Sequence, residues 1–144
     1  MLQNSLKLRI HDLQKIQILR FRVKNFEFIR IQFTLNTLWE TNDYPVLEVS
    51  EDGVDFCRHL KNGVTYSKKS FKESFVYGRT YDFFILMDGR KLLFGTFEKL
   101  KFRTIGFYFY DELATLPYLG FSSINEADWI LENSIITSVY IRNC

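Results

Sequence analysis

Two apolar runs joined by Asp88-Gly89 constrain the fold of this chain more than any other feature of its sequence. The runs span residues 81–87 and 91–97, and a third run, residues 103–109, follows after a basic break. An Asp-Gly pair between strand-like runs is the strongest short-range hairpin signal, because a type I′ turn needs positive φ at both central residues. Residues 71–109 are therefore predicted to form an antiparallel sheet.

The rest of the chain repeats this arrangement of short strands and tight turns. Asp52-Gly53 and Asn62-Gly63 each lie between β-prone runs, and residues 28–37 alternate between apolar and polar side chains. Strands that recur about every 8–12 residues are typical of an all-β sandwich or barrel. The predicted strands cover residues 6–10, 15–24, 26–38, 46–50, 54–60, 64–68, 81–87, 91–97, 103–109 and 134–142.

The composition agrees with an all-β fold. The chain of 144 residues contains 15 Phe and 8 Tyr, and aromatic side chains pack well on pleated, half-buried surfaces. The short helical candidates are residues 111–116 and the segment after Ser123. We expect one antiparallel β-sandwich domain over residues 1–144, with little helix. A β-bulge near Ile18–Leu19 would keep a single apolar face inward along residues 15–24.

Charge and segment content argue against several functional classes. A net charge of +2 lacks the concentrated basic stripe of a nucleic-acid-binding protein. The first residues contain no signal-peptide core, and no apolar run approaches the roughly 18 residues of a membrane-spanning helix. Cys57 and Cys144 are predicted to be free thiols in a reducing compartment. We therefore expect a cytoplasmic protein with no nucleic-acid partner, no membrane insertion and no cofactor.

The order of the predicted strands resembles that of the galectins, a family of jelly-roll-like sandwiches that bind β-galactosides on one concave face. Residues 28–37 look like the strand that precedes the family's sugar-binding strand. Residues 75–78, Phe-Val-Tyr-Gly, are similar to the family's Pro-Phe-x-x-Gly turn, and residues 81–86 to the strand after it. Residues 129–141 resemble the family's closing strand. The resemblance implies a lectin fold, and also an extracellular location reached without a signal peptide.

The sugar-binding residues of the family are mostly not matched. Its aromatic stacking position, a Trp, falls on Tyr66, which alone preserves the chemistry. The other positions fall on Glu48, Ser50, Asp52, Arg58, Lys69 and Phe71. The resemblance therefore implies a galactoside site that has been altered or lost, and a glycan or glycoprotein as the partner. The candidate ligand-binding residues are Glu48, Ser50, Asp52, Arg58, Tyr66 and Lys69.

These residue types suit a sugar, which needs paired donors and acceptors and an aromatic ring for its apolar face. Arg58 and Lys69 would favour an anionic glycan over a neutral one. The alternative is that Tyr66 is a half-buried strand aromatic and that the neighbouring charges are a solvated face.

The sequence does not predict an enzyme or a metal site. The densest carboxylate group is Glu48, Glu51, Asp52 and Asp55. A glycosidase uses two carboxylates, but residues 51–52 lie in a predicted turn, where acidic residues are favoured for backbone reasons. Cys57 and His59 would share one side of a strand, and a metal ion would need two further ligands.

The second functional hypothesis is a protein-interaction or structural sandwich. Residues 108–121 form an apolar insertion after the third run. Its part from 111 to 121 would either bind a partner or cover an open end of the core. An unprotected sheet edge could also pair with another protein or with a second copy of the chain as a homodimer.

Overall fold

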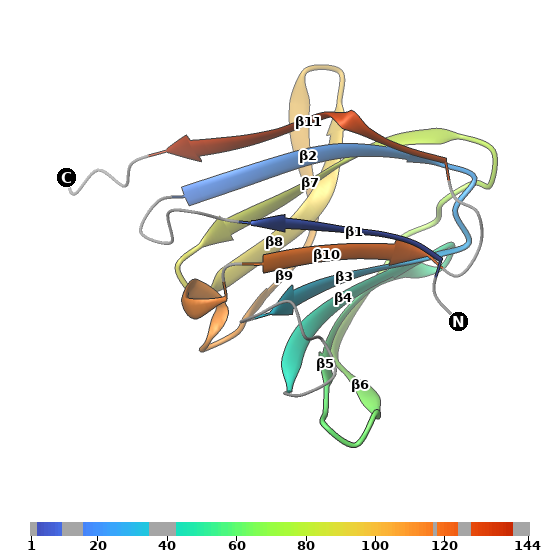
Figure 1. Ribbon diagram of the computed structural model, residues 1–144. Helices are drawn as coiled ribbons and strands as arrows, with labels where there is room; N and C mark the ends of the chain where they lie inside the picture. The colour runs from blue at the N-terminus through green and yellow to red at the C-terminus, as the bar shows by residue number, and fades with distance from the viewer. Residues whose placement is uncertain (1–2, 10–15, 35–42, 117, 124–127, 140–144) are drawn as a thin grey trace.

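The computed structural model describes residues 3–9, 16–34, 43–116, 118–123 and 128–139, and it confirms the predicted all-β fold. Two antiparallel sheets pack face to face as a sandwich (Figure 1). This is a jelly-roll-like arrangement, and one short 3₁₀ helix, Leu113–Thr115, is the only helix within the described part of the chain.

The sheets contain six and five strands. In spatial order the six-stranded sheet consists of β1 (Gln3–Arg9), β10 (Tyr118–Ser123), β3 (Phe28–Thr34), β4 (Tyr44–Ser50), β5 (Gly53–His59) and β6 (Thr65–Lys72). The five-stranded sheet consists of β11 (Asp128–Val139), β2 (Ile16–Lys24), β7 (Thr80–Asp88), β8 (Lys91–Glu98) and β9 (Lys101–Phe109).

The core between the sheets is rich in phenylalanine. Alternation along each strand sends every second side chain inward, and rings from both sheets meet there. Phe21 of β2 contacts Phe121 of β10, with 5.1 Å between ring centroids, and Phe83 of β7 contacts Phe94 of β8 at 5.0 Å. Such tilted and edge-to-face pairs add to the stabilisation from burial alone. Eight of the 15 Phe side chains of the sequence are buried in this core.

The hairpin predicted at Asp88-Gly89 is confirmed, although its turn lies one residue later than the sequence suggested. Asp88 still pairs with Lys91, so Gly89 and Arg90 are the two central residues. Gly89 has a φ of 59° and Arg90 is not among the residues with positive φ, which is the pattern of a type II′ turn.

The bulge predicted near Ile18–Leu19 is wrong. β2 pairs with β7 without interruption, and Ile18 lies on the side of β2 that faces away from the core. The irregularity is in the neighbouring strand, where the register of β11 shifts between Ile130 and Ile135. Ile18 lies half-buried on the outer surface of the five-stranded sheet. A single apolar side chain is tolerated at such a surface, so no bulge is needed to turn it inward.

The segment interpreted as an apolar insertion, residues 108–121, belongs to the core. Leu113, Leu116, Leu119 and Phe121 are buried, and the segment ends in β10, which lies between β1 and β3. Of the helical candidates, residues 111–116 contain the 3₁₀ helix. The segment after Ser123 is strand β11 from Asp128 onward, and residues 124–127 lie outside the described residues. Cys144 also lies outside them.

Candidate binding face

The outer face of the six-stranded sheet, which points away from the other sheet, carries a row of polar side chains. Strand register places five of them directly opposite one another on β10, β3, β4, β5 and β6. Neighbouring strands lie about 4.8 Å apart, so the part of the row from β3 to β6 is about 14 Å long. We call this set the polar row; it consists of Ser122, Arg30, Glu48, Asp55 and Ser70.

Glu48 lies at the centre of the polar row and is held by Cys57. The Cys57 thiol donates to Glu48 Oε1 over 3.5 Å. Burial raises the pKa of the Glu48 carboxyl, and Asp55 opposite raises it further, while Arg30 and the thiol act in the other direction. Burial and the Glu48 carboxylate both raise the pKa of Cys57, so the thiol stays protonated and can donate.

The β5–β6 end of the polar row forms a small network of oxygen atoms. The Ser70 hydroxyl donates to Asp55 Oδ1, and Ser67 Oγ lies 3.1 Å from Ser70 Oγ. Asp55 is half-buried, whereas both serines are exposed. A carboxylate and two hydroxyls at one accessible surface can both accept and donate hydrogen bonds.

A second network surrounds Arg30 on the same face. Its Nη2 lies 3.0 Å from His59 Nδ1 and 3.1 Å from Thr65 Oγ1, and His59 stacks on Tyr44 with 4.8 Å between ring centroids. Burial lowers the pKa of His59 and the Arg30 cation lowers it further, against a smaller opposing effect of Asp43. Arg30 Nε is buried and has no hydrogen-bond partner within the described residues, and the same is true of Gln32 Oε1 and Ser122 Oγ.

The six candidate residues predicted from the sequence do not all lie together. Glu48 and Ser50 are on the outer face of β4. Asp52 is in the β4–β5 turn. Arg58, Tyr66 and Lys69 are on the opposite side of β5 and β6, which faces the five-stranded sheet, as register with the buried Phe56 shows.

The charges on that opposite side are already engaged. Arg58 donates to both carboxylate oxygens of Glu112, over 2.6 and 3.1 Å, and this hydrogen bonding raises the pKa of the guanidinium. Lys69 Nζ lies 5.2 Å from the Phe71 ring centroid and 5.1 Å from that of Phe107. Tyr66 is 37% exposed and lies opposite Arg58. Arg58 and Lys69 are therefore not on the outer face, and the predicted preference for anionic glycans, which depended on these two cations, loses its basis.

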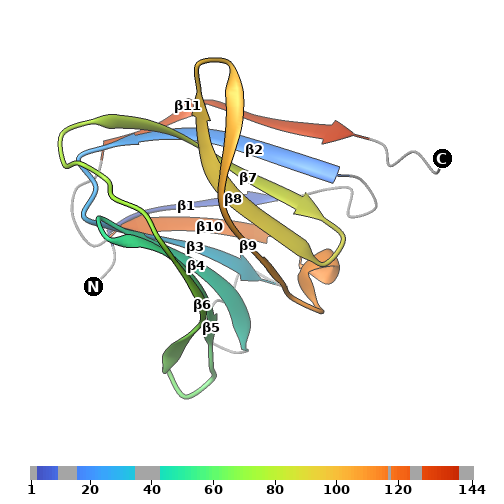
Figure 2. The ribbon, with the colours of Figure 1, turned by 180° about the vertical axis from the view of Figure 1, so that it is seen from behind.

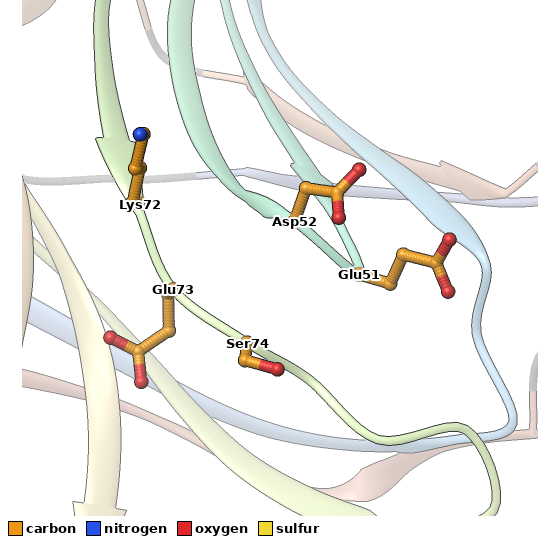
Figure 3. Close-up of a pocket in the computed structure, with 5 residues that line it drawn as sticks. All are labelled: Glu51, Asp52, Lys72, Glu73 and Ser74. Carbon is orange, nitrogen blue, oxygen red and sulfur yellow. The ribbon is translucent and has the colours of Figure 1, made fainter.

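Asp52 lines a surface pocket of about 530 Å³ between the β4–β5 turn and the end of β6. Figure 3 shows that the carboxylates of Glu51 and Asp52 point to the same side, whereas that of Glu73 points away from them. Glu73 is also bound to Arg103, over 2.8 and 3.3 Å. This arrangement does not supply the facing pair of carboxylates that glycoside hydrolysis uses.

Neither a metal-binding cluster nor a membrane-spanning helix occurs in the described part of the chain. Within the described residues, no three His, Cys, Asp or Glu side chains are grouped so that they could hold a metal ion. The same part of the chain has no helix of the length and apolarity needed to cross a membrane.

Sequence reasoning did not place Arg30 and Ser70 in a site. A signal was available for Arg30, because the alternation of residues 28–34 assigns it to the polar side of its strand. No comparable signal marks Ser70, since its position opposite Asp55 depends on the register of β5 against β6.

The two packed antiparallel sheets form a galectin-like β-sandwich. The chain is similar to the Caenorhabditis elegans galectin LEC-6, with 9% identity, a TM-score of 0.64, and coverage of 94% of this chain and 91% of that one. It is also similar to congerin II liganded with lactose and MES (8% identity, TM-score 0.65, 93% and 100% coverage). A third similar structure is the carbohydrate-binding module CBM66 from Bacillus subtilis (10% identity, TM-score 0.61, 86% and 73% coverage).

These similarities establish the fold alone. The identities of 8–10% are far below those that imply a common ligand. No protein-family model matches the sequence, and no curated protein matches it.

Proposed function

We propose that this protein is a non-enzymatic carbohydrate-binding module whose galactoside site has been altered. The observation that carries the proposal is the polar row, in which Arg30, Glu48, Asp55 and Ser70 lie in register across four adjacent strands. A row about 14 Å long that contains a guanidinium donor, two carboxylate acceptors and a hydroxyl suits the hydroxyls of a short oligosaccharide. The galectin and carbohydrate-binding-module structures with the same fold support this class of ligand.

The ligand is a neutral, hydroxyl-rich glycan. The accessible part of the polar row contains two carboxylates, Glu48 and Asp55, and one guanidinium, Arg30, whose Nη2 already contacts His59 and Thr65. A sulfate or carboxylate on the ligand would face these two carboxylates, and like charges at close range are unfavourable. Sugar hydroxyls, in contrast, can donate to both carboxylates. Ser50 extends the same surface along β4.

A glycan array at moderate salt, followed by calorimetry on the best neutral ligand, tests the proposal. We expect Asp55→Ala to weaken binding about tenfold or more, because a hydrogen bond to a charged acceptor is lost. Tyr66→Ala is the matched control: it removes a side chain from the adjacent strand on the opposite side of the sheet, and affinity should change little.

Circular dichroism and thermal unfolding establish that both variants are folded. Absence of binding to every glycan by folded wild-type protein would refute the proposal. If the Tyr66→Ala protein lost binding and the Asp55→Ala protein did not, the glycan site would lie on the side of β6 that carries Tyr66 and Lys69.

A further inference from the structure

The β8–β9 hairpin extends beyond the two sheets and exposes an apolar tip. Figures 1 and 2, which view the molecule from opposite sides, both show the hairpin rising past β2 and β11. Leu100 at its tip is 89% exposed, the highest value among the exposed large apolar side chains of the described residues. Phe102 beside it is 49% exposed. Leu100 at the tip and one side of the Phe102 ring beside it are therefore accessible to solvent.

The turn that presents Leu100 has an unfavourable backbone for the residues in it. Glu98 pairs with Lys101, so Lys99 and Leu100 are the two central residues, and their φ values are 49° and 64°. Positive φ at both central positions defines a type I′ turn, for which Asn-Gly is the preferred sequence. A leucine rarely adopts this left-handed conformation because its Cβ crowds the backbone. Leu100 therefore places an apolar side chain at the tip in a strained backbone conformation.

Positive charge surrounds this apolar tip. Residues 97–103, FEKLKFR, contain three cations and one carboxylate, a net charge of +2 that equals the net charge of the whole chain. Lys99 and Lys101 are exposed and form no ion pair among the described residues. The one carboxylate, Glu98, accepts from Thr96 Oγ1 over 3.2 Å and lies 3.8 Å from Arg103 Nε. Both lysines are thus available to an external anion.

The base of the hairpin is firmly packed. Phe102 contacts Phe84 and Phe97, each with 4.8 Å between ring centroids, and the Arg20 guanidinium carbon lies 3.7 Å from the centroid of Phe97. This cluster lies on the outer surface of the five-stranded sheet and supports the projecting tip. The tip therefore need not fold when it meets a surface, which lowers the entropic cost of binding.

We propose that residues 99–102 adsorb to a membrane surface that contains anionic lipids. Leu100 and the exposed side of the Phe102 ring enter the headgroup region. Lys99 and Lys101 contact lipid phosphates, as long cationic side chains do at membrane interfaces. A protein partner is disfavoured by shape, because stable protein interfaces bury about 800 Å² on each side and this tip is narrow and convex. The interaction is surface adsorption, which requires no membrane-spanning segment.

Co-sedimentation of the full chain with vesicles tests the proposal, using phosphatidylcholine alone and phosphatidylcholine with about a third phosphatidylserine at low salt. Binding to the anionic vesicles should exceed binding to the neutral ones. Replacing both lysines by Gln should reduce the partition coefficient on anionic vesicles by about 30-fold, with little effect on neutral vesicles.

Leu100→Asn separates membrane contact from folding, because Asn tolerates positive φ better than Leu and the turn should remain intact. We expect this variant to be at least as stable as wild type and to lose most of its binding to anionic vesicles. The matched control is Val64→Asn, which replaces an exposed apolar residue in the β5–β6 turn at the opposite end of the molecule (Figure 1).

Vesicle binding that is equal for the two lipid compositions would overturn the proposal, as would binding unaffected by Leu100→Asn. Failure of the wild-type protein to bind either vesicle would also overturn it, and would leave another protein as the partner of the hairpin tip.

Discussion

Tyr110 shows how a single hydroxyl connects the β9–β10 connection to β5. The ring is buried in the core, its hydroxyl donates to the Cys57 carbonyl over 2.8 Å, and burial strongly raises its pKa, which keeps the donor proton in place. We expect Tyr110→Phe to lower the free energy of unfolding by about 1–2 kcal/mol, because a buried acceptor loses its partner. Urea denaturation measures the change.

Tyr108→Phe is the control for this prediction. The Tyr108 ring packs on Tyr110 with 5.0 Å between centroids, so both variants keep the aromatic contact and each removes one hydroxyl. Because the Tyr108 side chain is only half-buried, loss of its hydroxyl in Tyr108→Phe should change the free energy of unfolding by less than about 0.5 kcal/mol. Equal effects in the two variants would contradict the role assigned to the Tyr110 hydroxyl.

Glu48 should make the stability of the fold depend on pH. Burial raises the pKa of its carboxyl in the folded protein above the ordinary value of 4.5. As pH rises from 4.5 through this raised pKa, the unfolded chain releases the proton first, so the free energy of unfolding decreases. Below 4.5 the carboxyl is protonated in both states and the penalty disappears.

Glu48→Gln removes this titration, so the variant should gain stability relative to wild type as pH rises through the window, and the difference should then level off. Chemical denaturation of both proteins between about pH 4 and pH 8 measures it. A stability difference that stays constant over this range would show that Glu48 is not desolvated as its surroundings indicate.

At the scale of elements, β6 and β9 hold the edges of the two sheets together through Gly106 and Phe71. A Cβ added at Gly106 would lie 2.4 Å from Phe71 Cδ2, far inside contact distance. Gly106→Ala should therefore destabilise the protein by about 1–3 kcal/mol through overpacking. Phe71→Ala should also destabilise it, because the ring packs against the core.

A double-mutant cycle separates this contact from other effects. In the Phe71→Ala background the added methyl group meets no ring, so Gly106→Ala should cost substantially less than in wild type. Thermal or urea unfolding of the four proteins gives the coupling energy. Additive effects would mean that β9 and β6 are not held together at this point.

The sequence predicts an element well when the residues that determine it are close together in the chain. Alternation identified β3, and the Asp88-Gly89 pair identified the β7–β8 hairpin, because both signals lie within a few residues. The position of β10 between β1 and β3 could not be predicted in the same way, since its partners are distant in the chain. The apolar residues Leu119 and Phe121 therefore looked like an insertion.

The candidate site shows the same limit at the level of register. Phe56 pairs with Lys69 but Cys57 pairs with Ser67, so Lys68 is an extra residue in β6. Without this bulge, Tyr66 would lie opposite His59 on the outer face. A one-residue shift moves every later side chain to the other face of the sheet. No local pattern in residues 64–72 predicts this shift.

At the scale of the whole molecule, the two proposed binding surfaces are separate. The polar row lies on the outer face of the six-stranded sheet, whereas the Leu100 tip projects from the five-stranded sheet (Figure 2). Substitutions that share no contacts have independent effects. We therefore expect Asp55→Ala to weaken glycan binding without changing vesicle binding, and Leu100→Asn to do the reverse.

Salt provides a second test of this separation. Raising ionic strength to about 0.5 M shortens the Debye length to roughly 4 Å, which should remove most adsorption to anionic vesicles through Lys99 and Lys101. Hydrogen bonds to a neutral glycan have no comparable long-range charge term, so calorimetric affinity should change by less than about twofold. If salt abolishes both activities together, either the glycan is anionic or one surface serves both ligands. The Asp55→Ala protein distinguishes these outcomes, because a shared surface would lose vesicle binding as well.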